Sequence, residues 1–187
     1  TFFLFPTDPS LYSDVAVPGG LRGDSGVDIR FANDVIIPPT GSDGKATIVD
    51  LGVRARCRRG DEYLAYWLTP RSSIGKTPLG VSMEIMMSGN VSGSSISLAN
   101  VVGLIDKSYQ GPLKVGVRNL STEPWKIAKG DALFQLVRRD LEPSRVEIVD
   151  SAHEAFAVAT LRGDGGFGST GVAGGSGEQK LEQKQTL

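Results

Sequence analysis

The sequence predicts an all-β domain, either a sandwich or a barrel. Short apolar or alternating runs recur along the 187 residues, and Gly, Pro, Asn and Asp separate them, which is typical of many short strands. Apolar residues at helical spacing are almost absent. Within 113–118 apolar side chains alternate with others, so one face should be buried, which favours an antiparallel sheet.

Turn signals divide the chain into the expected strands. Residues 38–39, 41–44 and 129–131 carry Pro, Gly and Lys-Gly-Asp turns, and the last turn joins 125–128 to the next strand. The expected strands are Val27–Phe31, Val35–Ile37, Ala46–Val53, Tyr63–Leu68, Val101–Ile105, Leu113–Val117, Trp125–Ala128 and Ala132–Val137.

Composition limits the classes of function. The formal net charge is −1 with both signs interspersed, so a small charged ligand fits better than nucleic acid or a membrane surface. Cys57 is the single cysteine and cannot form an internal disulfide, which indicates reducing surroundings. Pro6 and Asp8 interrupt the apolar run at 2–5, leaving it too short for a signal or membrane segment. We expect a soluble, intracellular protein, cytoplasmic or nuclear, or in a host cell if viral.

The chain length suits one domain, which we expect over residues 1–159. A Gly-rich segment, 160–173, follows this domain. Residues 174–187 are dominated by Gly, Ser, Glu, Gln and Lys without an apolar period, so a disordered tail is predicted there.

The segment 162–171 is the strongest indication of a ligand. Glycines let a backbone approach a ligand closely and turn its N–H groups toward an anion. Arg162, Ser169 and Thr170 are suited to phosphate oxygens, and Phe167 is suited to covering a planar base, which together indicate a nucleotide. No lysine follows the glycines, so the segment is not a Walker loop. The alternative is a flexible linker, which needs neither Arg162 nor Phe167.

The segment 102–111 is expected to lead through a turn into a return strand near Leu113, as a β-hairpin. Asp106 and Tyr109 lie near the bend. Taken alone, they favour an Asx-type turn and a packed ring. Beside a phosphate, Asp106 could instead orient a water molecule and accept its proton.

The segment 69–73 ends a strand with one cation and two hydroxyls. An ordinary reading is a turn in which Ser72 or Ser73 caps a short helical turn before Ile74. The functional reading is a second phosphate clamp centred on Arg71.

Five ordered motifs resemble those of the trimeric deoxyuridine triphosphate nucleotidohydrolases, or dUTPases. The resemblance spans roughly residues 20 to 171, and five motifs of distinct chemistry are far more specific than one Gly-rich loop. The motifs are Ser25–Ile29, Pro70–Ser73, Asn100–Gly111, Lys129–Leu136 and Arg162–Gly171.

This resemblance implies a jelly-roll-like β-fold, assembled as a homotrimer with active sites at the subunit interfaces. It implies hydrolysis of dUTP to dUMP and pyrophosphate by water attack on the α-phosphate, which keeps uracil out of DNA and supplies dUMP for thymidylate synthesis. Mg²⁺ would be held mainly by phosphates and water, with no direct protein ligand. The implied partners are dUTP and other copies of the chain, without nucleic acid or membrane.

The resemblance also implies roles for individual residues. Asp106 would be the catalytic base, while Asp28 would support the residues that touch the substrate or stabilise a turn. Asn100, Gly103 and Leu104 would read uracil, and Ile105 and Tyr109 would pack on the sugar. The remaining substrate-binding residues would be Arg71, Ser72, Ser73, Lys114, Gln135, Arg162, Phe167, Gly168, Ser169 and Thr170, the last five on a C-terminal lid from another subunit.

The chain departs from the family pattern in two places. Residues 80–97 look like an insertion, which could form an extra hairpin packed on the trimer or expose a Met-rich surface for a protein partner. The hairpin is favoured. Val27 stands where the family commonly has a larger residue, which should affect packing more than chemistry.

Two alternatives to a dUTPase are weaker. The dCTP deaminases resemble dUTPases in fold, but they need a glutamate on the returning strand, where this chain has Gly116 and no Glu from 114 to 120. A regulatory trimer could bind dUTP without catalysis, and Asp106 argues against it.

Overall fold

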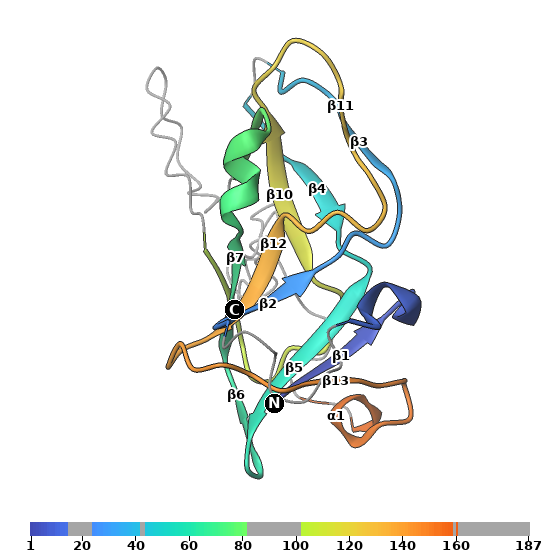
Figure 1. Ribbon diagram of the computed structural model, residues 1–187, viewed down its shortest axis with the longest axis vertical. Helices are drawn as coiled ribbons and strands as arrows, with labels where there is room; N and C mark the ends of the chain where they lie inside the picture. The colour runs from blue at the N-terminus through green and yellow to red at the C-terminus, as the bar shows by residue number, and fades with distance from the viewer. Residues whose placement is uncertain (15–23, 42–43, 82–101, 159, 161–187) are drawn as a thin grey trace, which may run out of the picture.

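A computed structural model describes residues 1–14, 24–41, 44–81, 102–158 and 160 (Figure 1). These residues form mainly β-strands, which confirms the predicted all-β class. The strands are β1 (Phe2–Pro6), β2 (Gly26–Ile29), β3 (Val35–Ile37), β4 (Thr47–Asp50), β5 (Val53–Arg59), β6 (Glu62–Leu64), β7 (Tyr66–Pro70), β8 (Leu79–Val81), β9 (Gly103–Ile105), β10 (Lys114–Asn119), β11 (Trp125–Ile127), β12 (Phe134–Arg138) and β13 (Val146–Ile148). The helices are the 3-10 turns η1 (Pro9–Tyr12) and η2 (Ser72–Lys76) and the α-helix α1 (Glu154–Ala157).

The described strands pair into four sheets, ordered β13-β1-β5-β6, β4-β10-β8, β11-β3 and β2-β12-β7-β9. All pairings are antiparallel except the one between β1 and β13. In the described part of the chain no helix is both long and apolar enough to span a bilayer.

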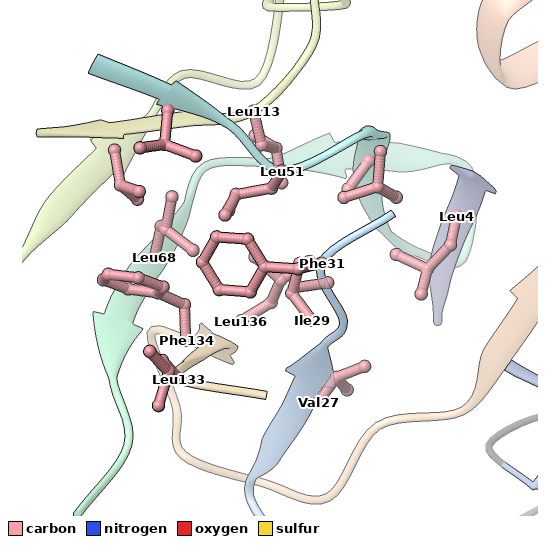
Figure 2. Packing of buried hydrophobic residues seen from close by; sticks show 14 of the residues in the cluster. Leu4, Val27, Ile29, Phe31, Leu51, Leu68, Leu113, Leu133, Phe134 and Leu136 are labelled. Carbon is pink, nitrogen blue, oxygen red and sulfur yellow. The ribbon is translucent and has the colours of Figure 1, made fainter. Parts of the chain in front are cut away.

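One apolar core joins these sheets. Figure 2 shows Phe31 at its centre, with side chains from several strands and loops around the ring. The rings of Phe31 and Phe134 lie 6.3 Å apart between centroids, and both side chains are almost fully buried. Because the residues around Phe31 are far apart in sequence, their burial is what fixes the sheets against one another.

Helix α1 covers the outer face of the β13-β1-β5-β6 sheet. Figure 1 shows the helix beside β1 and β13. Its capping residue His153 stacks on Phe3 with ring centroids 4.8 Å apart, and Phe156 lies 5.8 Å from Phe5. Phe3 is therefore only 1% exposed although it points away from the main core.

Strand β5 supplies the polar part of this outer face. Its core-facing residues are Val53, Ala55 and Cys57, and its outward residues are Arg54, Arg56 and Arg58. Each outward guanidinium lies over an aromatic ring, and such contacts are favourable for arginine. Burial raises the pKa of the Cys57 thiol, so this side chain behaves as a core residue.

Several sequence expectations need correction. The expected strand Ala46–Val53 is interrupted, since β4 ends at Asp50 and β5 begins at Val53, with Gly52 at φ +69° between them. The strands β1, β5, β8 and β13 and the helix α1 were not predicted. The expected run Tyr63–Leu68 divides between β6 and β7.

The expected β-hairpin around 102–113 is also wrong. Strand β9 pairs with β7, whereas β10 pairs with β4 and β8, so the two strands lie in different sheets. The turn 106–109 therefore links two sheets, since the strands before and after it pair with different partners.

Gly52 has a steric reason to be glycine beyond its left-handed backbone. A Cβ there would lie 2.3 Å from the Cβ of Ala32, whereas Gly60, at φ +56°, has open space around it. We expect Gly60→Ala to lower the free energy of unfolding by about 1 kcal/mol through backbone strain. Gly52→Ala should lower it by about 1 to 3 kcal/mol more through overpacking. Urea unfolding at one fixed protein concentration measures both variants, and equal losses would contradict the steric argument.

Candidate functional site

A polar row crosses three neighbouring strands of the β2-β12-β7-β9 sheet. In this sheet Gln135 on β12 lies opposite Asp28 on β2 and opposite Thr69 on β7. Directly opposed residues of antiparallel strands point to the same face, so the three side chains stand side by side. All three residues are half-buried.

Arg71 joins this row from the end of β7. Its Nε lies 2.8 Å from Asp28 Oδ1, and its Nη1 donates to the Ala132 carbonyl at 2.9 Å. The main-chain N–H of Arg71 donates to the Leu133 carbonyl at 2.8 Å. These contacts hold the guanidinium across β2 and the approach to β12, while 36% of the side chain stays exposed to a ligand.

The serines after Arg71 do not cap η2. The N-cap residue is Arg71 and no side-chain cap bond is formed, so the expectation that Ser72 or Ser73 caps this turn is wrong. Ser73 Oγ instead donates to the Ala132 carbonyl at 3.2 Å, and Ser72 is exposed. The hydroxyl of Ser73 thereby ties the 70–73 segment to the approach of β12.

Gln135 packs tightly against β2. Its amide Nε2 donates to the Pro70 carbonyl at 3.5 Å, and a Cβ on Gly26 would lie 2.0 Å from its Oε1. Glycine at position 26 therefore makes room for the Gln135 side chain. The motifs at 25–29, 70–73 and 129–136 thus meet in one polar cluster, defined by Asp28, Arg71, Ser73 and Gln135.

The charge of Asp28 is held at an energetic cost. Burial raises the pKa of Asp28, and the Arg71 and Arg30 guanidinium groups offset part of that rise. A carboxylate kept in such surroundings beside a cation is typical of functional sites.

A second group of predicted residues surrounds the turn at Asp106. Strand β9 ends at Ile105, and the Tyr109 N–H donates to the Asp106 carbonyl at 3.0 Å. The Tyr109 hydroxyl donates to the Pro112 carbonyl at 2.8 Å, which fixes the ring. Asp106 is half-buried.

The other predicted residues of this group lie on β9 and β10. Gly103 is buried, Leu104 is 60% exposed and Ile105 is half-buried. Lys114 begins β10, where it is exposed and lies opposite Asp50 of β4.

The two groups stand at opposite ends of β7. Ile105 lies opposite Tyr66 at the start of β7, whereas Arg71 follows its last residue, Pro70. A strand rises about 3.3 Å per residue, so Tyr66 to Arg71 spans about 17 Å. One copy of the chain therefore does not bring Asp106 to Arg71.

Several predicted site residues lie outside the described part of the chain. They are Asn100, Arg162, Phe167, Gly168, Ser169 and Thr170, together with residues 82–97 of the expected insertion. Their roles stay predictions.

The described residues contain no group of three or more His, Cys, Asp or Glu side chains that could hold a metal ion. A surface hollow of about 550 Å³ beside Asp150 and His153 contains no predicted site residue. A second hollow, of about 510 Å³, lies beside Asn33 and Arg54 and likewise contains none.

Sequence reasoning did not find the Ala132 carbonyl, which accepts hydrogen bonds from both Arg71 and Ser73. A backbone acceptor carries no side-chain signal, so only the meeting of two segments sixty residues apart reveals it.

Comparisons with known proteins agree with the resemblance. The family model described as dUTPase matches residues 78–171. A deoxyuridine 5'-triphosphate nucleotidohydrolase of Hydrogenovibrio crunogenus is 34% identical over 168 residues, which cover 88% of this chain and 92% of the relative. The protein of the same name in Pasteurella multocida is 35% identical over 150 residues, 80% of this chain and 83% of the relative. A solved mutant dUTPase of Staphylococcus bacteriophage 80alpha with dUpNHpp is 20% identical, with a TM-score of 0.48 over 92% of this chain and 99% of that one.

The raised pKa of Asp28 makes a prediction about stability. Above its folded-state pKa the ionised carboxylate disfavours the folded state, and this cost disappears as the pH falls below the ordinary aspartate pKa of 3.8. Asp28→Asn should therefore be as stable as the parent protein or more stable at about pH 7, and that advantage should vanish at about pH 3. Urea unfolding of both proteins at the two pH values checks the sign. A less stable Asn variant at neutral pH would mean that the Arg71 ion pair outweighs burial.

Proposed function

Because this chain belongs to the dUTPase family, we propose that it hydrolyses dUTP to dUMP and pyrophosphate. The observation that carries the proposal is its similarity to deoxyuridine 5'-triphosphate nucleotidohydrolases along 92% and 83% of their length. The polar cluster of Asp28, Arg71, Ser73 and Gln135 supports it, because three of the family's motifs meet there. The reaction uses free deoxynucleotides, so the proposed compartment is inside the cell.

The polar cluster is the proposed phosphate end of the site. Arg71, Ser72, Ser73 and Gln135 would contact the triphosphate, and a guanidinium forms strong charge-assisted bonds to phosphate oxygens. Asp28 would act through Arg71, since its carboxylate already accepts the Nε of that side chain. It fixes the direction of the guanidinium without needing to touch the substrate.

The turn after β9 is the proposed nucleoside end. Among the described strands β9 lies at the edge of its sheet, so alternate N–H and C=O groups of 103–105 point away from β7. Such groups, with Asn100, would pair with the edge of uracil, and cytosine would leave buried groups unpaired. Tyr109 would close the pocket against the deoxyribose, leaving no room for a 2'-hydroxyl.

Asp106 is the proposed base. It would accept a proton from water as the water oxygen bonds to the α-phosphorus and the bond to the pyrophosphate oxygen breaks. Lys114, which is exposed at the start of β10, would add positive charge to this end. Gly116 takes the place of the glutamate that a deaminase needs, which favours hydrolysis over deamination.

Mg²⁺ is the proposed cofactor, and it fits the donor set. The polar cluster offers one carboxylate, already engaged by Arg71, and Mg²⁺ commonly binds substrate phosphates while it keeps several waters. When bound, the ion would neutralise charge on the phosphate oxygens. Arg71, Ser73 and Gln135 would then orient the phosphates around it.

The separation of the two ends along β7 favours a site between subunits. A symmetric trimer would place the Asp106 turn of one subunit beside the Arg71 cluster of the next, and each interface would repeat the site. The segment 160–173 would add a lid to the site, contributed by another subunit. Residues 1–159 would form the domain, with 174–187 as a tail and 80–97 as a candidate surface for a protein partner.

Asp106→Asn should keep dUTP binding and lower turnover by about 10²- to 10⁴-fold, because an amide cannot accept the proton. Pyrophosphate release with Mg²⁺ from dUTP, dCTP, dTTP and UTP measures both activity and selectivity. Release from dUTP alone is expected. Asp61→Asn, an exposed acid on another turn, is the matched control and should behave like the parent protein. Binding of dUTP without any turnover in the parent would favour the regulatory trimer.

Mixing two inactive variants tests the shared site. Asp106→Asn and Arg71→Ala should each be inactive alone, but each supplies the residue that the other lacks. After dissociation and reassembly of an equal mixture, about a quarter of sites would combine an intact Arg71 with an intact Asp106 from a neighbour. Recovery of about that share of the parent activity is expected. No recovery, with mixed oligomers verified by mass spectrometry, would place both residues in one subunit.

A further inference from the structure

Arg56 is a buried charge on the outer face of β5. Arg56 is only 6% exposed, and no carboxylate of the described residues pairs with its guanidinium group. Its guanidinium carbon lies 3.5 Å from the centroid of the Tyr63 ring. The charge is therefore sheltered by an aromatic face and compensated by carbonyl groups.

The Arg56 guanidinium bridges two segments that are far apart in sequence. Its Nη2 donates to the Lys107 carbonyl at 2.8 Å, and its Nη1 donates to the Ala155 carbonyl at 2.9 Å. Lys107 directly follows Asp106, inside the turn that the Tyr109 N–H closes. Arg56 therefore connects the turn of the proposed base to helix α1.

Other side chains reinforce the same junction. Gln110 is also only 6% exposed. Its side-chain amide donates to the Ala155 carbonyl at 3.2 Å and to the Val158 carbonyl at 2.8 Å. The Thr160 hydroxyl donates to the Ser108 carbonyl. The turn is thus joined to Ala155, Val158 and Thr160 by a set of hydrogen bonds, and of these bonds only those from Arg56 have a charged side chain as donor.

The buried charge needs a reason. Burial lowers the pKa of Arg56, which reports the cost of removing the guanidinium from water. An apolar side chain would fill the space without that cost. The rigid planar fork of arginine aims two separate nitrogens at the two carbonyls, whereas an apolar group offers no donor and lysine offers a single nitrogen on a flexible stem.

We propose that Arg56 is a positioning residue for Asp106, which it serves by holding the main chain of the 106–110 turn against α1. The inference rests on the proposed role of Asp106 as the base. A base must stand within hydrogen-bond reach of its water, so the main-chain position of the turn directly sets its efficiency. Arg56 acts through the Lys107 carbonyl and does not touch the substrate.

Arg58 provides a matched control on the same strand and the same face. It pairs with Glu154 of α1 and lies over the Phe3 ring, 4.8 Å from its centroid. It therefore anchors the helix as Arg56 does, but its side-chain partners lie on α1, β1 and β6, where Tyr63 shares a hydrogen bond with it, and not in the 106–110 turn. Comparing the two arginines separates anchoring of the helix from positioning of the turn.

The test compares Arg56→Met, Arg56→Lys, Arg58→Met and Asp106→Asn in the full-length protein. For Arg56→Met we expect kcat for dUTP to fall about 10- to 100-fold, as for a displacement of about 1 Å, with KM nearly unchanged. Amide hydrogen exchange at Tyr109 should accelerate in the same variant, because its bond to the Asp106 carbonyl loosens. Arg58→Met should keep the parent kcat and the parent exchange rate. Arg56→Lys keeps the charge but replaces the two Nη donors with one flexible ammonium nitrogen, so its kcat should fall between those of the parent and the Met variant.

The other outcomes are also decisive. Equal losses of kcat in Arg56→Met and Arg58→Met would reduce Arg56 to a helix anchor, and a parent-like kcat and Tyr109 exchange in Arg56→Met would overturn the inference. If the Met variant does not fold, Arg56→Lys decides: parent-like kcat and exchange overturn the proposal. Parent-like turnover in Asp106→Asn would instead overturn the role of Asp106 in the proposed function, so the two failures are distinguishable.

Discussion

The simultaneous pairing of β12 with β2 and β7 is the constraint on which the polar cluster depends. Its register sets Gln135 opposite both Asp28 and Thr69, and brings the Ala132 and Leu133 carbonyls to Arg71. A slip of one residue would turn Gln135 into the core and Phe134 or Leu136 toward solvent. Because those two side chains are almost fully buried around Phe31, the apolar core enforces the register. The same burial that stabilises the fold therefore aligns the proposed phosphate contacts.

Two buried or half-buried charges illustrate different ways of holding a functional group. Burial disfavours the ionised form of Asp28, and Arg71 offsets part of this cost. The ion pair also fixes the direction of the guanidinium group. Arg56 instead donates to two carbonyls and lies against the Tyr63 ring, and it thereby links the main chain of the 106–110 turn to that of α1. In both cases a neutral residue would pack at lower cost, so the charge is better explained by orientation than by stability.

Local patterns in the sequence predicted a large part of this description. Alternation and turn residues predicted the all-β class and several strands, among them β3 with the observed bounds. The predicted family is confirmed by its relatives. Predictions of pairing failed, as for the hairpin at 102–113, because adjacent strands in sequence joined different sheets. Strand β5 was not predicted, although its alternating arginines have a strand period, since the contacts that bury Arg56 on its outward face come from segments distant in sequence.

The sequence by itself determined the chemistry available: the motifs, their order, and a carboxylate, a cation and hydroxyls suited to a nucleotide. Only the tertiary structure decided which of these groups meet. It joined Asp28, Arg71, Ser73 and Gln135, and it placed the turn that begins at Asp106 at the other end of β7, where the Lys107 carbonyl accepts from Arg56. The physical reason is that periodicity and turn residues are local properties, whereas strand pairing and the burial of charge depend on partners distant in the chain.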